Sequence, residues 1–262
     1  MDFRFDGTKL SSKGYMMYAD GVSDEEVAVS GMMFDVIKAS LSDVSHKVAH
    51  NYSENYTRTF SIMKSPCGND QSLTLSEQDV SDMTQWLVRK QYKTFRYVDD
   101  NGTNYPTWYK VQNTVSKVVY ADEVIGLTIT VNANAPYGFY NEATTTWSGN
   151  SKELTVVSDE EGYIYPTMVI TCNAAGNLTI TNSREENRTT TINNVTSGEI
   201  ITITGGDTLQ IKSSVSGHDL ATDFNYVFPR LSVTYSNKVN TISTNLSSDK
   251  ELSYYGIRKV GL

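Results

Sequence analysis

The feature that most constrains this chain is an alternation of apolar and polar residues that recurs in short runs. Within VSKVVYADEVIGLTITVNANAP, Leu127, Ile129 and Val131 alternate strictly with polar residues, and Phe3 and Phe5 alternate with charged residues near the start. A period of two puts the apolar side chains on one face of a β-strand and leaves the other face in water. The chain also has 17 tyrosines and only five prolines, which suits half-buried strands. We therefore predict a mainly β protein.

One segment departs from this pattern. In LSEQDVSDMTQWLVRK, apolar residues recur at the spacing of one helix face: Val80, Met83, Trp86 and Leu87. Ser76 stands at the N-cap position, and Asp79 follows three residues later, where an acidic side chain can cap in return. Acidic residues at the start and basic residues at the end suit the helix dipole. The sequence predicts a single helix over about residues 77–90.

The chain has 262 residues, enough for one large domain or two ordinary ones. Around residues 134–150, within NANAPYGFYNEATTTWSGN, the periodicity is lost, and this segment is predicted to be a linker. After it, strand signals recur about every eight to twelve residues, and EIITITGGDTLQI reads as two strands around a Gly-Gly-Asp turn. We predict two antiparallel β domains, residues 1–133 with the helix and residues 151–262 as a β-sandwich.

A β-hairpin is predicted in FRYVDDNGTNYPTWYKV, because Asn and Gly tolerate the positive φ that tight turns need. Its arms carry five aromatic residues: Phe95, Tyr97, Tyr105, Trp108 and Tyr109. Such a hairpin can belong to the core, or it can be an arm that packs on a neighbouring subunit. The residues alone leave both readings open, and these five are the candidate subunit-interface residues.

Few residues suit catalysis or metal binding. The three histidines include His46 and His50 in HKVAH, but a zinc protease needs a glutamate where Lys47 stands, and the segment reads as a strand. The acidic clusters Asp24–Glu26, Asp99–Asp100 and Asp159–Glu161 lie beside glycine or serine, as solvated turn acids do. No phosphate loop, Gly-x-Ser-x-Gly or Cys-x-x-Cys occurs. We expect no catalytic residue, no metal and no cofactor.

The net charge, the cysteines and the hydropathy of the chain limit the partners and the location that we expect. The net charge of −8 gives the chain no electrostatic reason to bind a nucleic-acid backbone. Cys67 and Cys172 are far apart in sequence, and we expect two thiols rather than a disulfide. The first residues lack the basic and apolar regions of a signal peptide, and no run of about 18 apolar residues occurs, so neither secretion nor a membrane span is expected.

A carbohydrate-binding function is an alternative, because sandwich proteins often stack exposed aromatic rings on sugars. The candidates are Tyr137, Phe139, Tyr140 and Trp147 near the linker, or Tyr163 and Tyr165. The competing reading is that these residues pack in the hinge and the core.

The order of the segments resembles the distal tail protein family of long-tailed, siphovirus-type bacteriophages. FRFDGTKLSSKGYMMY is similar to the family's opening strand and F-x-F-x-G motif, and VYADEVIGLTITVNANAPYGFY to the passage between its domains. LTITNSREENRTTTINNVTSGEIITITGGDTLQI resembles its later hairpin, and FNYVFPRLSVTYSNKVNTI its ending. The sequence departs from the family at SVTYS, where a glycine is usual, and it has no room for an inserted carbohydrate-binding module.

This resemblance implies a non-enzymatic structural protein of the virion, at the distal end of the tail and made in the host cytoplasm. The first domain would close a hexameric ring, and the second would be a galectin-like sandwich. The ring would join the tail tube protein to the tail-associated fibre or lysin hub and to receptor-binding proteins. DNA would pass through its lumen as cargo, past a wall that we expect to be acidic or neutral.

Two other functions stay open on the residues alone. One is a free-standing, lectin-like β-sandwich protein. The other is a glycan-degrading enzyme that uses a pair of carboxylates. A tail hub predicts oligomerisation, a lectin predicts a monomer or dimer with affinity for glycans, and an enzyme predicts that one Asp or Glu is indispensable.

Overall fold

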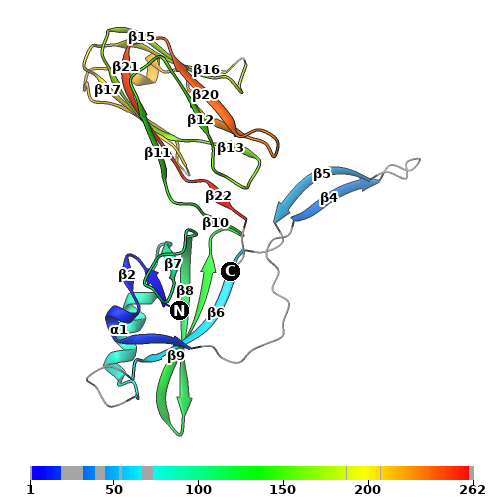
Figure 1. Ribbon diagram of the computed structural model, residues 1–262, viewed down its shortest axis with the longest axis vertical. Helices are drawn as coiled ribbons and strands as arrows, with labels where there is room; N and C mark the ends of the chain where they lie inside the picture. The colour runs from blue at the N-terminus through cyan, green and yellow to red at the C-terminus, as the bar shows by residue number, and fades with distance from the viewer. Residues whose placement is uncertain are drawn as a thin grey trace. The chain divides into compact units, whose positions relative to one another are not determined.

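A computed structural model describes residues 2–18, 32–38, 45–52, 55–66, 73–186, 188–206 and 208–259, with the backbone alone described for 32–38 and 45–52. The chain divides into two compact units. The first comprises Met1–Phe139 and Lys259–Leu262, and the second comprises Tyr140–Arg258. Figure 1 shows the elements of each unit.

The first unit is built on one antiparallel sheet in the order β2-β1-β7-β8-β9-β6-β3. Its strands are β1 (Asp2–Phe5), β2 (Thr8–Lys9), β3 (Tyr15–Tyr18), β6 (Thr57–Lys64), β7 (Lys93–Val98), β8 (Tyr109–Tyr120) and β9 (Glu123–Ala133). A 3-10 turn, Ser11–Lys13, connects β2 to β3. The unit also contains β10 (Gly138–Phe139) and a separate hairpin of β4 (Met32–Lys38) and β5 (Ser45–Tyr52).

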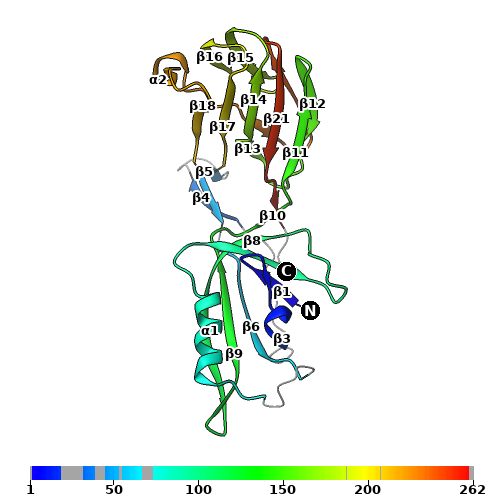
Figure 2. The same ribbon diagram turned by 90° about the vertical axis from the view of Figure 1, so that its left-hand side faces the viewer.

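The alternating residues of these strands form the core of the first unit. Phe3 and Phe5 of β1 are fully buried, and so are Leu127 and Val131 of β9, while Ile129 is 1 % exposed. These are the residues whose period of two predicted strands, and that prediction is confirmed. Their side chains lie on one face of the sheet, and α1 (Glu77–Leu87) covers this face (Figure 2).

The helix begins where the sequence predicts. The Ser76 side chain accepts a hydrogen bond from the Asp79 backbone N–H, and the Asp79 carboxylate accepts one from the Ser76 N–H, so the capping box is complete. The helix ends at Leu87 rather than near residue 90, because Val88 adopts an extended backbone. A β-branched side chain disfavours further helix, and the Arg89 side chain donates instead to the Trp86 carbonyl.

The second unit is a sandwich of two antiparallel sheets. The five-stranded sheet has the order β11-β21-β14-β17-β18, and the four-stranded sheet has the order β12-β20-β15-β16. The strands of the first are β11 (Ala143–Trp147), β14 (Thr167–Cys172), β17 (Ile200–Thr204), β18 (Gln210–Ser213) and β21 (Ser248–Tyr254). Those of the second are β12 (Ser151–Thr155), β15 (Gly176–Asn182), β16 (Thr189–Val195) and β20 (Val239–Thr244).

Smaller elements complete the second unit. β13 (Gly162–Ile164) pairs with β19 (Leu231–Val233). The unit also contains α2 (Leu220–Asp223) and β22 (Ile257–Arg258). Met168, Ile170, Leu178, Ile192, Ile201 and Leu252 are fully buried in the core of this unit. The predicted turn in EIITITGGDTLQI joins β17 and β18, which pair through Ile203 and Ile211. The fold class is therefore the predicted one, two antiparallel β units with a long helix only in the first.

Two local predictions need correction. The predicted linker, 134–150, contains the boundary between the two units, after Phe139, but it also contains β10 and β11, and β11 pairs along its whole length with β21. Its sequence is ATTTW, and alternate residues are exposed, as expected for an edge strand. Because threonines occupy both faces of the strand, the sequence shows no apolar periodicity. The alternation of Phe224, Tyr226 and Phe228 in FNYVFP predicts that they share one strand face in the core, and the structure contradicts this prediction. Only Phe224 is buried, while Tyr226 has φ +58° and is 67 % exposed.

Candidate functional site

The structure places four of the five candidate interface residues inside the first unit. Phe95 and Tyr109 are fully buried, Tyr97 is 5 % exposed and Trp108 is 9 % exposed, whereas Tyr105 is 36 % exposed. The turn at Asp99–Gly102 closes the predicted hairpin, and Phe95 of β7 pairs with Tyr109 of β8.

The buried aromatic residues of this hairpin contact the unit's own core. The Phe95 ring lies 5.2 Å from that of Phe3 and 4.9 Å from that of Tyr97, measured between ring centroids. These distances are typical of packed aromatic pairs. Of the two readings that the sequence leaves open, packing in the core fits these buried residues. Phe95, Tyr97 and Tyr109 belong to the buried core of the unit, and the Trp108 ring packs on Phe139, so among these five residues Tyr105 is the one left exposed.

The other face of the same sheet is polar and largely free of charge over three adjacent strands. Nine hydroxyl and amide residues lie on it: Thr57, Thr59 and Ser61 of β6, Thr128, Thr130 and Asn132 of β9, and Gln112, Thr114 and Ser116 of β8. The Thr59 and Thr130 hydroxyl oxygens are 3.0 Å apart, and those of Ser61 and Thr128 are 2.9 Å apart. We call these nine residues the hydroxyl face. Its hydroxyls bond to one another across strands, so the face is ordered without ion pairs.

Positive charge lies beside the hydroxyl face rather than on it. Arg4 of β1 pairs with Arg96 of β7, and Lys110 of β8 pairs with Thr94. The Arg4 side chain donates to the Asn104 side-chain oxygen, and Lys110 Nζ lies 5.9 Å from the centre of the Phe139 ring. The sheet surface is therefore cationic at the β1–β7 end and at Lys110, and it is uncharged over the nine residues of the hydroxyl face.

The ends of β8 and β9 project as a hairpin beyond the rest of the sheet (Figure 1). β6 pairs with β9 only from Leu127 to Asn132, so among the described strands the tip pairs with itself alone. Ala121 and Asp122 both have positive φ, which is the geometry of a tight hairpin turn. The tip exposes Val119 at 57 % and Tyr120 at 73 %. Two neighbouring apolar side chains in water mark this tip as a candidate contact.

The aromatic residues considered for sugar binding differ in their exposure. Phe139 packs on Trp108 and Tyr137 within the first unit, with ring centroids 4.9 and 5.8 Å apart. Trp147 packs against the core of the second unit. Tyr140 is half-buried and donates its hydroxyl to the Asp159 carboxylate.

Tyr163 is the most exposed of these candidates, at 55 %. Tyr165 is half-buried. The Arg230 guanidinium lies over the Tyr163 ring, 3.5 Å from its centre. Tyr163 is therefore the candidate with a ring that remains accessible at the surface.

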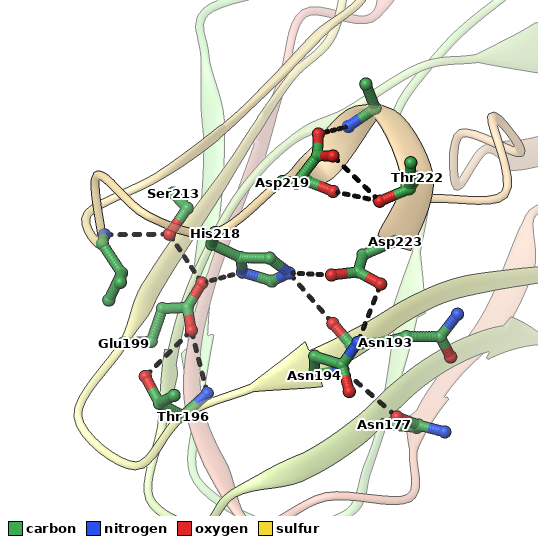
Figure 3. A network of polar contacts seen from close by, with 12 residues as sticks. Asn177, Asn193, Asn194, Thr196, Glu199, Ser213, His218, Asp219, Thr222 and Asp223 are labelled. Atoms are coloured by element: carbon green, nitrogen blue, oxygen red, sulfur yellow. Dashed lines mark hydrogen bonds and ion pairs between the residues drawn. The ribbon is translucent and has the colours of Figure 1, made fainter.

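The densest polar cluster of the second unit surrounds His218, as Figure 3 shows. Protonated His218 donates from Nδ1 to the Glu199 carboxylate and from Nε2 to the Asn193 carbonyl at 2.9 Å, with an Asp223 oxygen 3.4 Å away. The other Glu199 oxygen accepts from the Thr196 backbone N–H at 2.8 Å. The Glu199 side chain is fully buried, and that of His218 is 3 % exposed. This cluster ties the segment before α2 to β16 and β17.

Despite its residue types, the cluster is not arranged as a catalytic site. The Ser213 hydroxyl donates to Glu199 at 2.6 Å, so both Ser213 and His218 bind the same carboxylate. A nucleophile needs a base that accepts its proton, and that base must reach a substrate. His218 instead bonds a backbone carbonyl and two carboxylates, out of contact with solvent. The arrangement stabilises the fold.

The cluster also sets the pKa values of its members. Burial acts to lower the pKa of His218, but its hydrogen bond to Glu199 and the charges of Glu199 and Asp223 outweigh burial and raise it above 6.5. Burial acts to raise the pKa of Glu199, but hydrogen bonds from Ser213, His218 and Thr196 outweigh burial and lower it to about 2. Both shifts favour the charged forms of the two groups.

A pH dependence of stability follows. The contribution of His218 is fully present below pH 6.5 and is lost as the pH rises through the raised pKa; that of Glu199 is present above pH 4.5 and is lost as the pH falls towards 2. We expect the free energy of unfolding of the second unit to be highest between these limits and to fall above pH 6.5. Urea unfolding across pH 4–9 measures this, and His218→Gln should flatten the alkaline fall. An equal fall in both proteins would contradict the assignment.

The other histidines, acidic residues and cysteines considered for chemistry do not come together in the part of the chain that the structure describes. His46 and His50 lie in the strand β5, as predicted, and their side chains fall outside the described residues. Asp99 Oδ1 accepts from the Thr103 N–H within its own turn, and Glu161 accepts from the Tyr235 N–H of a segment 74 residues away, so each of these acids has a structural partner. Asp24–Glu26 and Cys67 lie outside the described residues. Cys172 is a buried thiol, and burial and the Glu199 charge raise its pKa to about 11.

Among the described residues, no group of three or more metal-ligating side chains could hold a metal ion. Nor is any helix of this part of the chain long and apolar enough to cross a membrane. No sequence pattern indicates the Glu199–His218 pair, because 19 residues separate the two and only the fold brings them together. The contact of Arg230 with Tyr163 likewise has no sequence signal beyond the residue types.

Comparisons with known proteins cover the whole chain. A family model described as a phage tail protein N-terminal domain matches residues 1–135, and one described as a phage tail C-terminal domain matches residues 137–254. The crystal structure of the phage SPP1 Dit (gp 19.1) protein, described as a paradigm of the hub adsorption apparatus in phages that infect Gram-positive bacteria, is similar with a TM-score of 0.67. That similarity has 9 % identity and covers 97 % of this chain and 98 % of the other. No curated protein matches.

Proposed function

Because the chain belongs to the phage tail proteins, whose N- and C-terminal domain models together span it, we propose that it is a structural hub of a tail tip. The expected resemblance to distal tail proteins is confirmed at the level of the fold. In this proposal the protein has no enzymatic activity. It forms a hexameric ring in the virion, at the distal end of the tail, after synthesis in the host cytoplasm.

The sheet of the first unit carries the proposal of a ring. One of its faces is covered by the aromatic core and α1, whereas the hydroxyl face is ordered and, apart from the buried Ser61, exposed or half-buried. Among the described residues, nothing pairs with the outer edges of β2 and β3. Unpaired edges favour strand pairing with a second copy. A head-to-tail contact of this kind closes into a ring when the rotation between copies fits.

The hydroxyl face supports the proposed passage of DNA. Lysine and arginine bind phosphates and release their counterions, which gives affinity that would hold DNA in the channel. A wall of hydroxyl and amide groups offers no such charge, and we propose that the hydroxyl face lines the lumen. Of the acidic and the neutral wall expected from the sequence, this proposal takes the neutral one, since the nine residues of this face carry no charge.

The partners follow from the same proposal. One side of the ring would contact the tail tube protein, and the other would contact the fibre or lysin hub and receptor-binding proteins. The exposed tip at Val119 and Tyr120 is a contact suited to one of them, because it presents apolar surface on a projecting hairpin. A free-standing lectin is the weaker alternative, since the family models assign both halves of the chain to phage tails.

Light scattering of the purified chain, followed by negative-stain imaging, tests the ring. We expect a species of about six copies with a central hole. The Ser65 N–H donates to the Gly14 carbonyl, so by antiparallel alternation the Met17 N–H points away from β6. Met17→Pro removes this outward donor and should reduce the mass to that of a monomer.

Met17→Ala is the matched control, because it shortens the same side chain but keeps the N–H. It should still assemble. A wild-type protein that stays monomeric in the presence of its tube and hub partners would contradict the proposal. Rings that form equally well with Met17→Pro would exclude β3 as the pairing edge.

A further inference from the structure

A charged groove lies on the second unit, at the turn between β15 and β16. It has a volume of about 700 Å³, within the range of small-molecule sites. Its wall is formed by Tyr163, Ser183, Arg184, Glu185, Glu186, Arg188 and Arg230. Three guanidinium groups, two carboxylates and one aromatic ring therefore meet at one open surface.

One half of the groove is held rigid by its own contacts. Arg230 donates from Nε and Nη2 to the same Glu185 oxygen, at 3.0 and 2.7 Å. Its guanidinium also lies 3.5 Å from the centre of the Tyr163 ring. The ion pair neutralises both charges, and the stacking fixes the orientation of the guanidinium. Tyr163 still exposes 55 % of its surface beside it.

In the other half, Arg184 and Arg188 bind neutral acceptors within the described part of the chain. Arg184 Nη2 donates to the Thr234 hydroxyl at 3.2 Å, and Arg188 Nη2 donates to the Phe228 carbonyl at 3.1 Å, and both acceptors are neutral. Arg188 Nε is buried and has no hydrogen-bond partner in the described part of the chain. A buried donor without an acceptor is costly, and such groups normally have partners. This unsatisfied donor marks the Arg188 end of the groove as short of acceptors within the described part of the chain.

The mixed lining restricts the chemistry of that ligand. Free phosphate offers acceptors to the arginines but meets Glu185 and Glu186 unfavourably. A neutral sugar offers hydroxyl donors to the carboxylates but leaves the charges of Arg184 and Arg188 without a counter-charge. A sugar that bears a phosphate or carboxylate supplies both, and its ring face can pack on Tyr163. An acidic peptide satisfies the arginines but has no comparable row of hydroxyl donors.

We propose that this groove binds an anionic saccharide, with Arg184 and Arg188 at the acidic group and Tyr163 beside the sugar ring. The site goes beyond the proposed function, because it needs neither a ring nor a partner protein. Binding is therefore measured on the full chain in whatever oligomeric state it adopts. A failure of ring assembly would leave the result intact.

Isothermal titration calorimetry with four polymers tests the proposal. The probes are hexose-substituted polyglycerol phosphate, polygalacturonate, neutral dextran and polyglutamate. We expect one of the first two to bind, and which of them binds separates phosphate from carboxylate. Arg184→Gln should weaken that binding by about tenfold or more, since a hydrogen bond to a charged group is lost. Tyr163→Ala should also weaken the binding of that saccharide polymer. It should leave the heat measured with polyglutamate unchanged.

Lys152→Gln is the matched control, because it removes one positive charge from an exposed residue of β12 in the same unit. It should leave the affinity unchanged. Equal losses in Arg184→Gln and Lys152→Gln would reduce the effect to net charge and overturn the site. Binding of polyglutamate alone would make the groove a protein contact, and binding of no probe, or of dextran equally well, would also overturn the proposal. Circular dichroism confirms that each variant is folded.

Discussion

Replacing Glu199 by alanine is expected to destabilise the second unit by about 3–5 kcal/mol, the usual cost of removing one partner of a buried ion pair. The Glu199 carboxylate accepts four hydrogen bonds, from the Thr196 N–H and hydroxyl, the Ser213 hydroxyl and His218. Alanine leaves these donors without their acceptor inside the protein, and His218 keeps a buried charge that only Asp223 faces. The loss should exceed that of any single surface change.

Urea unfolding gives the size of this loss, and hydrogen–deuterium exchange of peptides from β16, β17 and α2 places it. Glu251→Ala is the matched control, because Glu251 is exposed on β21 and should change stability by no more than about 0.5 kcal/mol. Glu199→Gln should fall between the two, since its amide oxygen can still accept from Thr196. A Glu199→Ala protein as stable as the control would mean that the cluster contributes nothing net.

Replacing Phe95 by alanine is expected to destabilise the first unit by about 3–5 kcal/mol. Phe95 is fully buried and lies against Phe3, Phe60 and Tyr97, so the change removes a whole ring and leaves a cavity. Tyr105→Ala, in the same hairpin, should cost little because Tyr105 is 36 % exposed. Hydrogen–deuterium exchange of peptides from β1, β7 and α1 measures the loss of stability in both variants.

This pair of variants also separates the two readings of the hairpin. If the aromatic residues served a subunit interface, Phe95→Ala would leave the unfolding free energy of the monomer unchanged and lower only the mass of the assembly. We expect the opposite for Phe95. A reduced assembly in Tyr105→Ala, with normal stability, would assign Tyr105 alone to the interface.

Much of the fold was predictable because its signals are local. The alternation of Leu127, Ile129 and Val131 depends only on the two-residue period of a strand, and the start of α1 depends on two side chains three residues apart. The turn between β17 and β18 follows from glycine in the same way. Edge strands lack such signals: β11 carries threonines on both faces, so its sequence resembles that of a linker.

The sequence by itself determined the strands, the long helix and the family resemblance, because each rests on residues close together in the chain or on the order of segments. Only the tertiary structure decided which side chains meet. It brought His218 to Glu199, placed Arg230 on Tyr163, and turned the hairpin aromatics inward to Phe3. The buried Asn240 shows the same limit, since its amide bonds both backbone groups of Ser232 in another strand. Contacts between distant segments depend on how strands pair, and no local pattern records that pairing.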